Sequence, residues 1–118
     1  MTDTIVIDMK ALERLHEWGG KRLVAQMIDL FLSQAPQRVA GLQDGLSDGD
    51  LELVERSAHS LKSTAANLGA TGLSEAAAEA EAAAGEKNLD RVRELFPKVE
   101  AEFDRAREAL ALMEQETS

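Results

Sequence analysis

The sequence predicts an all-α fold, an antiparallel up-down four-helix bundle with a short extra N-terminal helix. Its residues favour helices, since Ala, Leu, Glu and Arg are frequent and the only aromatic residues are one Trp and three Phe. Apolar residues recur at helical spacing, and no alternating strand pattern of useful length is present. The patterns are separated by only a few residues, so successive helices are expected to lie antiparallel.

The N-terminal half is expected to hold two helices. Residues 8–19 form the short extra helix, which the Gly19-Gly20 pair ends. Residues 21–46 carry a longer apolar pattern, and Pro36 inside it should kink this helix or split it in two. A turn follows, in which Asp50 is a good N-cap for the next helix.

The C-terminal half is expected to hold three helices, over residues 51–68, 72–84 and 89–114. Gly69 is placed to adopt the left-handed conformation that ends the first of them. Thr71 and Asn88 can cap the second and third helices, and Pro97 should interrupt the third. No repeat or composition shift marks a second domain, so we expect residues 1–118 to form one domain.

Composition excludes several classes of function. The formal net charge of −9 argues against nucleic-acid partners and anionic membranes, both of which require a basic face. The absence of cysteine excludes disulfides and thiolate metal sites. The chain begins without an export signal and holds no uninterrupted apolar stretch of about 18 residues. We therefore expect a soluble, cytoplasmic, free-standing monomer.

Helical geometry sets His59 apart from the apolar stripe of its helix. Successive residues turn by about 100°, which places His59 roughly 130° from the centre of that stripe and near the surface. Its neighbours at helical spacing are Glu55, Lys62, Ser63 and Ala66. Apart from Glu55 and Lys62 these side chains are small, so a partner can approach the imidazole closely.

An accessible imidazole of this kind can accept a phosphoryl group. The neutral ring is a nucleophile at cytoplasmic pH, and Lys62 is placed to offset the charge of a phosphoryl group on nitrogen. The chain has no nucleotide-binding loop, so it needs a phosphoryl donor and an acceptor. On geometry alone, however, an exposed histidine near a lysine is usually part of a solvated helix face.

The segment AHSLKSTAANLGA, residues 58–70, closely resembles the signature of histidine-containing phosphotransfer (HPt) domains of bacterial phosphorelays. That signature reads Ala-His-x-Leu-Lys-Gly/Ser, a Ser/Ala-rich stretch, then an apolar residue and Gly. The resemblance extends along nearly the whole chain, through Ile7-Asp8, Gly19-Gly20, Phe31-Leu32, Ala35-Pro36, Gly49-Asp50 and Leu73.

The resemblance implies a phosphocarrier rather than an enzyme. Such a protein accepts a phosphoryl group from a receiver-domain aspartate and passes it to another, or back. Its expected partners are response-regulator receiver domains and a sensor or hybrid histidine kinase. The chain itself is expected to bind no cofactor or metal, while Mg²⁺ is expected on the partner receiver domain.

The resemblance also suggests roles for individual residues. His59 is the phosphorylated residue, and Lys62 is its basic neighbour. Ser63 stands where the family often has glycine, so it keeps the site small but limits the approach of the partner. Glu81 matches a position that often holds Gln or Glu. There it either orients the His59 imidazole or is a solvated residue of an acidic helix. The expected partner-binding residues are Glu55, Ser63 and Ala66.

Two other functions stay open. The first is an adaptor that binds receiver domains or a kinase without transferring phosphate, in which His59 and Lys62 are surface residues. The second is a metal- or cofactor-binding bundle enzyme. It has weak support, since no histidine lies at i+4 from either His16 or His59, and Arg56 stands where a Glu-x-x-His motif needs glutamate. His16, beside Trp18, matches no motif and is expected to be incidental.

Overall fold

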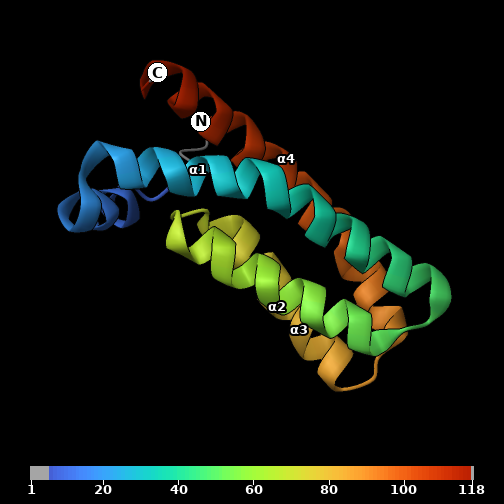
Figure 1. Ribbon diagram of the computed structural model, residues 1–118. Helices are drawn as coiled ribbons and strands as arrows, with labels where there is room; N and C mark the ends of the chain where they lie inside the picture. The colour runs from blue at the N-terminus through green and yellow to red at the C-terminus, as the bar shows by residue number, and fades with distance from the viewer. Residues whose placement is uncertain (1–5, 118) are drawn as a thin grey trace, which may run out of the picture.

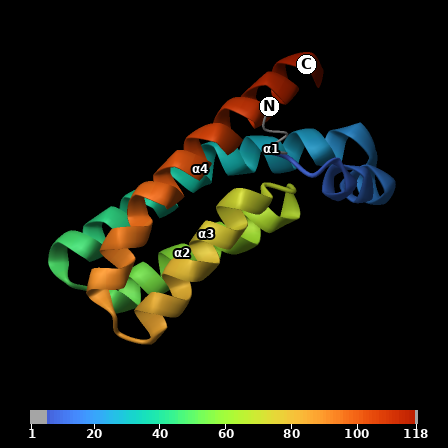
Figure 2. The same cartoon turned by 180° about the vertical axis from the view of Figure 1, so that it is seen from behind.

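The computed structural model describes residues 6–117 of the chain. They form four helices, α1 (Met9–Asp48), α2 (Leu51–Asn67), α3 (Thr71–Gly85) and α4 (Leu89–Thr117). Successive helices reverse direction, α2 packs on α1 and α3, and α4 packs on the same two helices (Figure 1). The same arrangement is seen from behind, where α3 lies beside α2 (Figure 2). The predicted all-α four-helix bundle is therefore confirmed.

The short N-terminal helix predicted over residues 8–19 is not a separate element. Residues 9–19, which we call the N-terminal segment, are the first part of α1. Gly20 interrupts this helix with φ 71° and ψ −167°, and the segment before it folds back at the end of the bundle (Figure 1). Glycine adopts a positive φ without a steric penalty, so one residue reverses the chain and no connecting loop is needed.

The two prolines do not divide their helices as predicted. Pro36 lies inside α1 and Pro97 inside α4, and both helices continue past them. The fixed φ of proline is itself helical, so the ring removes one backbone hydrogen bond without requiring a turn. Both rings are exposed. The packing of the flanking apolar residues therefore holds each helix together.

The helix ends mostly follow the predicted caps. The Asp50 carboxylate accepts a hydrogen bond from the Leu53 amide at 3.1 Å, and the Asn88 side chain accepts one from the Arg91 amide at 3.1 Å. Gly69 follows α2 with a φ of 76°. Thr71 is the exception, because it is the first residue of α3 and its hydroxyl donates to the Gly69 carbonyl at 3.3 Å.

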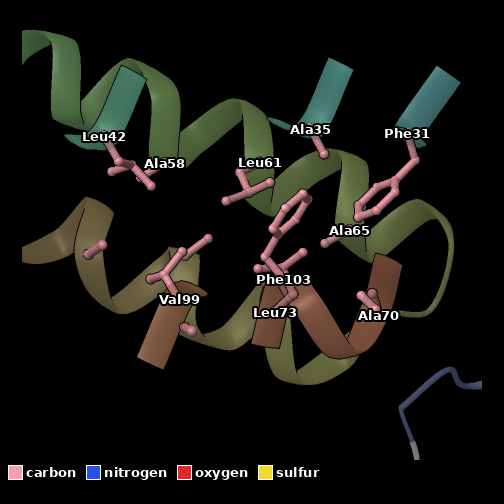
Figure 3. Close-up of a cluster of buried hydrophobic side chains, with 14 of the residues drawn as sticks. Phe31, Ala35, Leu42, Ala58, Leu61, Ala65, Ala70, Leu73, Val99 and Phe103 are labelled. Carbon is pink, nitrogen blue, oxygen red and sulfur yellow. The ribbon is translucent and has the colours of Figure 1, made fainter. Parts of the chain in front are cut away.

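All four helices contribute to one apolar core (Figure 3). Phe31 of α1 and Phe103 of α4 pack with their ring centroids 6.2 Å apart. The buried face of α3 is built mainly from small side chains, Leu73, Ala76, Ala77, Ala80, Ala83 and Ala84. Small side chains at a helix contact shorten the distance between the helix axes, so α3 can lie close to its neighbours. Over the residues that the structure describes, every helix is too short or too polar to cross a bilayer.

Candidate functional site

His59 stands on the exposed face of α2. Its side chain is 62% exposed, whereas Ala58 and Leu61 beside it are fully buried in the core. The high amphipathicity of α2 explains this placement, because one helix face is occupied by apolar residues and the other is left to solvent. The imidazole is therefore anchored on a rigid helix and open to a partner.

Glu81 of α3 reaches across to this imidazole. Its Oε2 lies 2.7 Å from the Nδ1 of His59. Glu81 follows the buried Ala80 on α3, at the edge of the alanine face, and its side chain is only 21% exposed. The close packing of α3 on α2 thus brings a carboxylate beside a ring that lies 22 residues away in the sequence.

The same carboxylate also holds Lys62. The Nζ of Lys62 lies 2.6 Å from Oε1 of Glu81, and the lysine side chain is 34% exposed. The hydrogen bond from Lys62 and, with a smaller effect, that from His59 lower the pKa of Glu81 below its ordinary value of 4.5, although partial burial opposes them. Glu81 is therefore ionised at neutral pH.

An ionised Glu81 fixes the tautomer of His59. A carboxylate can only accept hydrogen bonds, so the bond of 2.7 Å requires the proton on Nδ1. In the neutral ring, the lone pair available for bond formation is then on Nε2, on the far side of the ring from Nδ1. The arrangement offers a nucleophilic nitrogen to solvent and a carboxylate to balance positive charge on the ring.

The other predicted site residues lie on exposed positions of α2. The Glu55 carboxylate lies over Gly85 at the end of α3, where a Cβ added to that glycine would be 3.2 Å from Oε2. Ser63 and Ala66 are exposed one and two turns beyond His59. The structure thus brings His59, Lys62 and Glu81 into contact, and sets Glu55, Ser63 and Ala66 along the helix on either side of them.

Two further residues lie near this face that the sequence pattern did not single out. Trp18 and Arg14, on the N-terminal segment, line a hollow of about 380 Å³ together with Ala66 and Asn67 of α2. The Trp18 side chain is 75% exposed. In the sequence, Arg14 and Trp18 are four residues apart, and this helical spacing, which places them on one face of the segment, could have indicated them.

Gly69 attaches the N-terminal segment to the α2–α3 connection. The Asp8 amide donates to the Gly69 carbonyl at 2.7 Å. A Cβ on Gly69 would collide with the Asp8 carbonyl oxygen, and the positive φ of 76° also favours glycine. The position that ends the predicted signature helix is thus also the point where the segment docks.

Among residues 6–117, no group of three or more histidine, aspartate or glutamate side chains is arranged to hold a metal ion. Within the same residues, the only polar cluster around the imidazole consists of His59, Lys62 and Glu81. Its chemistry is that of a positioned nucleophile with an adjacent cation.

Comparisons with known proteins point to one family. The family model of the Hpt domain matches residues 26–109. The chain is similar to histidine-containing phosphotransfer protein B (HptB) from Pseudomonas aeruginosa PAO1, whose crystal structure superposes with a TM-score of 0.89. The two are 26% identical, and the superposition covers 97% of this chain and 98% of that chain. A comparison with curated proteins finds no match.

Proposed function

The chain belongs to the Hpt domain family, and on that premise we propose that His59 carries the phosphoryl group, through its Nε2 atom. The family makes it a histidine-containing phosphotransfer protein of a phosphorelay, a phosphocarrier and not a kinase. The observation that supports His59 is the contact of an ionised Glu81 with Nδ1, which leaves Nε2 as the nucleophile on a side chain that is 62% exposed.

In the proposed transfer, the Nε2 lone pair attacks the phosphorus of an aspartyl phosphate on a receiver domain. The N–P bond forms as the P–O bond to the aspartate breaks, and the aspartate leaves as a carboxylate. The proton stays on Nδ1, so the ring gains positive charge, which Glu81 stabilises from 2.7 Å. The reverse sequence returns the phosphoryl group to another receiver.

Lys62 is proposed to stabilise the negative charge of the phosphoryl group, as Glu81 stabilises the positive charge of the ring. Its ammonium is held by Glu81 one turn from His59, so a positive charge already stands beside the imidazole. The flexible four-carbon side chain can rotate toward a new phosphoryl group, which carries more negative charge than the carboxylate. Glu81 thereby keeps the cation near the site before the phosphoryl group arrives.

The partner is expected to supply much of the chemistry. A response-regulator receiver domain brings an acidic cluster, and the Mg²⁺ bound there neutralises charge on the transferring group. This chain contributes the imidazole and a docking face in which Glu55, Ser63 and Ala66 contact the partner. The Ser63 side chain is small and exposed, so it leaves room for the partner to approach the centre of that face.

The finer properties of the chain belong to the same proposal. We place the protein in the cytoplasm as a monomer with residues 1–118 acting as one domain. Besides the receiver domain, the second partner in phosphoryl transfer is a sensor or hybrid histidine kinase. The chain binds no cofactor of its own.

Transfer from a phosphorylated receiver domain tests the proposal directly. We expect incubation to place an acid-labile, alkali-stable label on the wild-type chain. His59→Gln should remove the label completely, because it removes the nucleophile. His16→Gln is the matched control, since it changes the chain's other exposed histidine, and it should keep the label.

Label that persists in His59→Gln would overturn the assignment to His59. A receiver domain that binds the wild-type chain but never labels it would instead favour the adaptor function. A stoichiometric metal in the purified protein would favour the bundle enzyme.

A further inference from the structure

One face of the N-terminal segment forms one side of the hollow beside the docking face. Arg14 and Trp18 lie one turn apart, and the α2 side of the hollow is formed by Ala66 and Asn67. Trp18 is the most exposed of the large apolar side chains that the structure describes, at 75%. A tryptophan side chain can bury about 200 Å² of surface, which makes an indole that stays mostly in water beside a hollow unusual.

A receiver interface of standard size centred on His59 reaches the α2 side of this hollow. Ala66 is seven residues beyond His59, which is about 10 Å along the helix axis. A stable protein interface covers about 800 Å² on each partner, equivalent to a disc of about 16 Å radius. A partner of that size centred on His59 must therefore extend over Ala66, on the α2 side of the hollow.

The charges around the hollow fit an acidic partner. Arg14 lines the hollow and forms no ion pair within residues 6–117. At the other end of the same helix face, Glu52 and Glu55 line a separate hollow. An acidic receiver surface is attracted to the Arg14 end and repelled at the glutamate end, which sets the orientation of docking.

We propose that Trp18, flanked by Arg14, is a specificity-determining contact for the receiver domain, buried when that domain docks on His59. This inference rests on the proposed function and adds a second contact region outside the His59 helix. Aromatic side chains beside a pocket commonly supply a large share of binding energy, while residues around them exclude water. Trp18 therefore acts on docking and takes no part in the transfer of the phosphoryl group.

The test compares Trp18→Ala with Leu112→Ala. Leu112 is an apolar side chain of similar exposure, 62%, on α4, and it does not line the hollow. The phosphoryl donor is a receiver domain selected because it labels the wild-type chain. We expect Trp18→Ala to raise KM for that phosphorylated receiver by roughly tenfold with little change in kcat. Trp18→Phe should recover most of the affinity, and Leu112→Ala should change neither constant.

Two further readouts separate docking from chemistry. Phosphoramidate is a small donor that needs no docking surface, so it should label His59 equally in the wild type and in Trp18→Ala. The chain has one tryptophan, so its ¹⁵N spectrum holds a single indole N–H signal, which should shift when unlabelled receiver is added.

An unchanged KM in Trp18→Ala, or an indole signal that stays in place as receiver binds, would overturn the inference while leaving His59 as the phosphorylated residue. If phosphoramidate does not label His59 and the label from the receiver lies on another residue, the proposed function is overturned, and this inference with it.

Discussion

The two histidines of this chain are both exposed on helices, yet their surroundings differ in kind. His59 has a carboxylate 2.7 Å from Nδ1, and that carboxylate also holds a lysine. His16, on the N-terminal segment, lines an apolar hollow of about 300 Å³, and its side chain forms no hydrogen bond or ion pair within residues 6–117. Exposure alone therefore does not distinguish a phosphoryl acceptor. Under the proposed function, the fixed tautomer and the nearby cation set His59 apart.

The two regions meet at Gly69, and the largest predicted effect tests that junction. Gly69→Ala should lower the free energy of unfolding by about 3 kcal/mol, because it combines a strained positive φ with a collision against Asp8. Urea unfolding measures the change. Phosphoramidate labelling of His59 in the folded variant should persist, since the His59–Glu81 contact does not involve the N-terminal segment.

Gly49→Ala is the matched control for Gly69→Ala. Gly49 has a similar φ of 69°, but a Cβ added there meets no atom within 4 Å. Only the backbone strain remains, so we expect a loss of about 1 kcal/mol. Equal losses in the two variants would show that the contact with Asp8 contributes nothing to stability.

Local patterns in the sequence predicted much of the fold. The start of the His59 helix at Leu51 and the caps at Asp50, Gly69 and Asn88 depend on neighbouring residues, and the structure has them where they were expected, with the helix one residue shorter than predicted. The continuation of α1 through Pro36 was not predictable in the same way, because tertiary packing outweighs a local helix breaker.

The candidate site depends more on distant contacts. The distance between His59 and Glu81 follows from how closely the alanine face of α3 packs on α2, and a single sequence does not specify that distance. The position of Trp18 beside Ala66 follows from the reversal at Gly20. The roles of these residues in transfer stay predictions.

Ser63→Phe places a large ring on the proposed docking face and leaves the His59–Glu81 pair unchanged. A ring on this exposed position blocks close approach of the receiver, so kcat/KM for transfer should fall by about a hundredfold. Transfer assays with phosphorylated receiver measure it. Ser33→Phe introduces the same ring on an exposed position of α1 and should have little effect. Unchanged transfer to Ser63→Phe would show that the docking face lies elsewhere.

Lys62→Ala removes the cation that distinguishes His59 from His16. We expect transfer to slow, or the lifetime of phosphohistidine to shorten, by about tenfold without unfolding of the bundle. Lys98→Ala is the control, since Lys98 also pairs with a glutamate of α3, at 3.0 Å, but its partner is Glu79 and not the Glu81 that contacts the imidazole. Equal effects of the two substitutions would assign the change to general surface charge.

The smallest expected effect is a pH dependence of stability that arises from Glu81. Its pKa is lower in the folded chain than its ordinary value of 4.5, so it binds fewer protons when folded. Its contribution is therefore present above pH 4.5 and is lost as the pH falls through the lowered pKa. The pair is partly exposed, so we expect less than about 1 kcal/mol.

Urea unfolding of the wild type and Glu81→Gln, at pH 5.5 and again near pH 3, measures this contribution. The stability difference between the two proteins should be larger at the higher pH. Glu79→Gln, which removes a glutamate of the same helix whose pair with Lys98 is more exposed, controls for the loss of a surface carboxylate. A difference for Glu81→Gln that grows as the pH falls would contradict the assignment.

The central claim is that Glu81 holds Nδ1 of His59 and thereby directs the phosphoryl group to Nε2. The most direct measurement is ¹⁵N and ³¹P NMR on the chain with ¹⁵N-labelled histidine rings, after transfer from a phosphorylated receiver domain. We predict coupling of phosphorus to Nε2 of His59, with the signals of His16 unchanged. Coupling to Nδ1 of His59, or to either nitrogen of His16, would contradict the account.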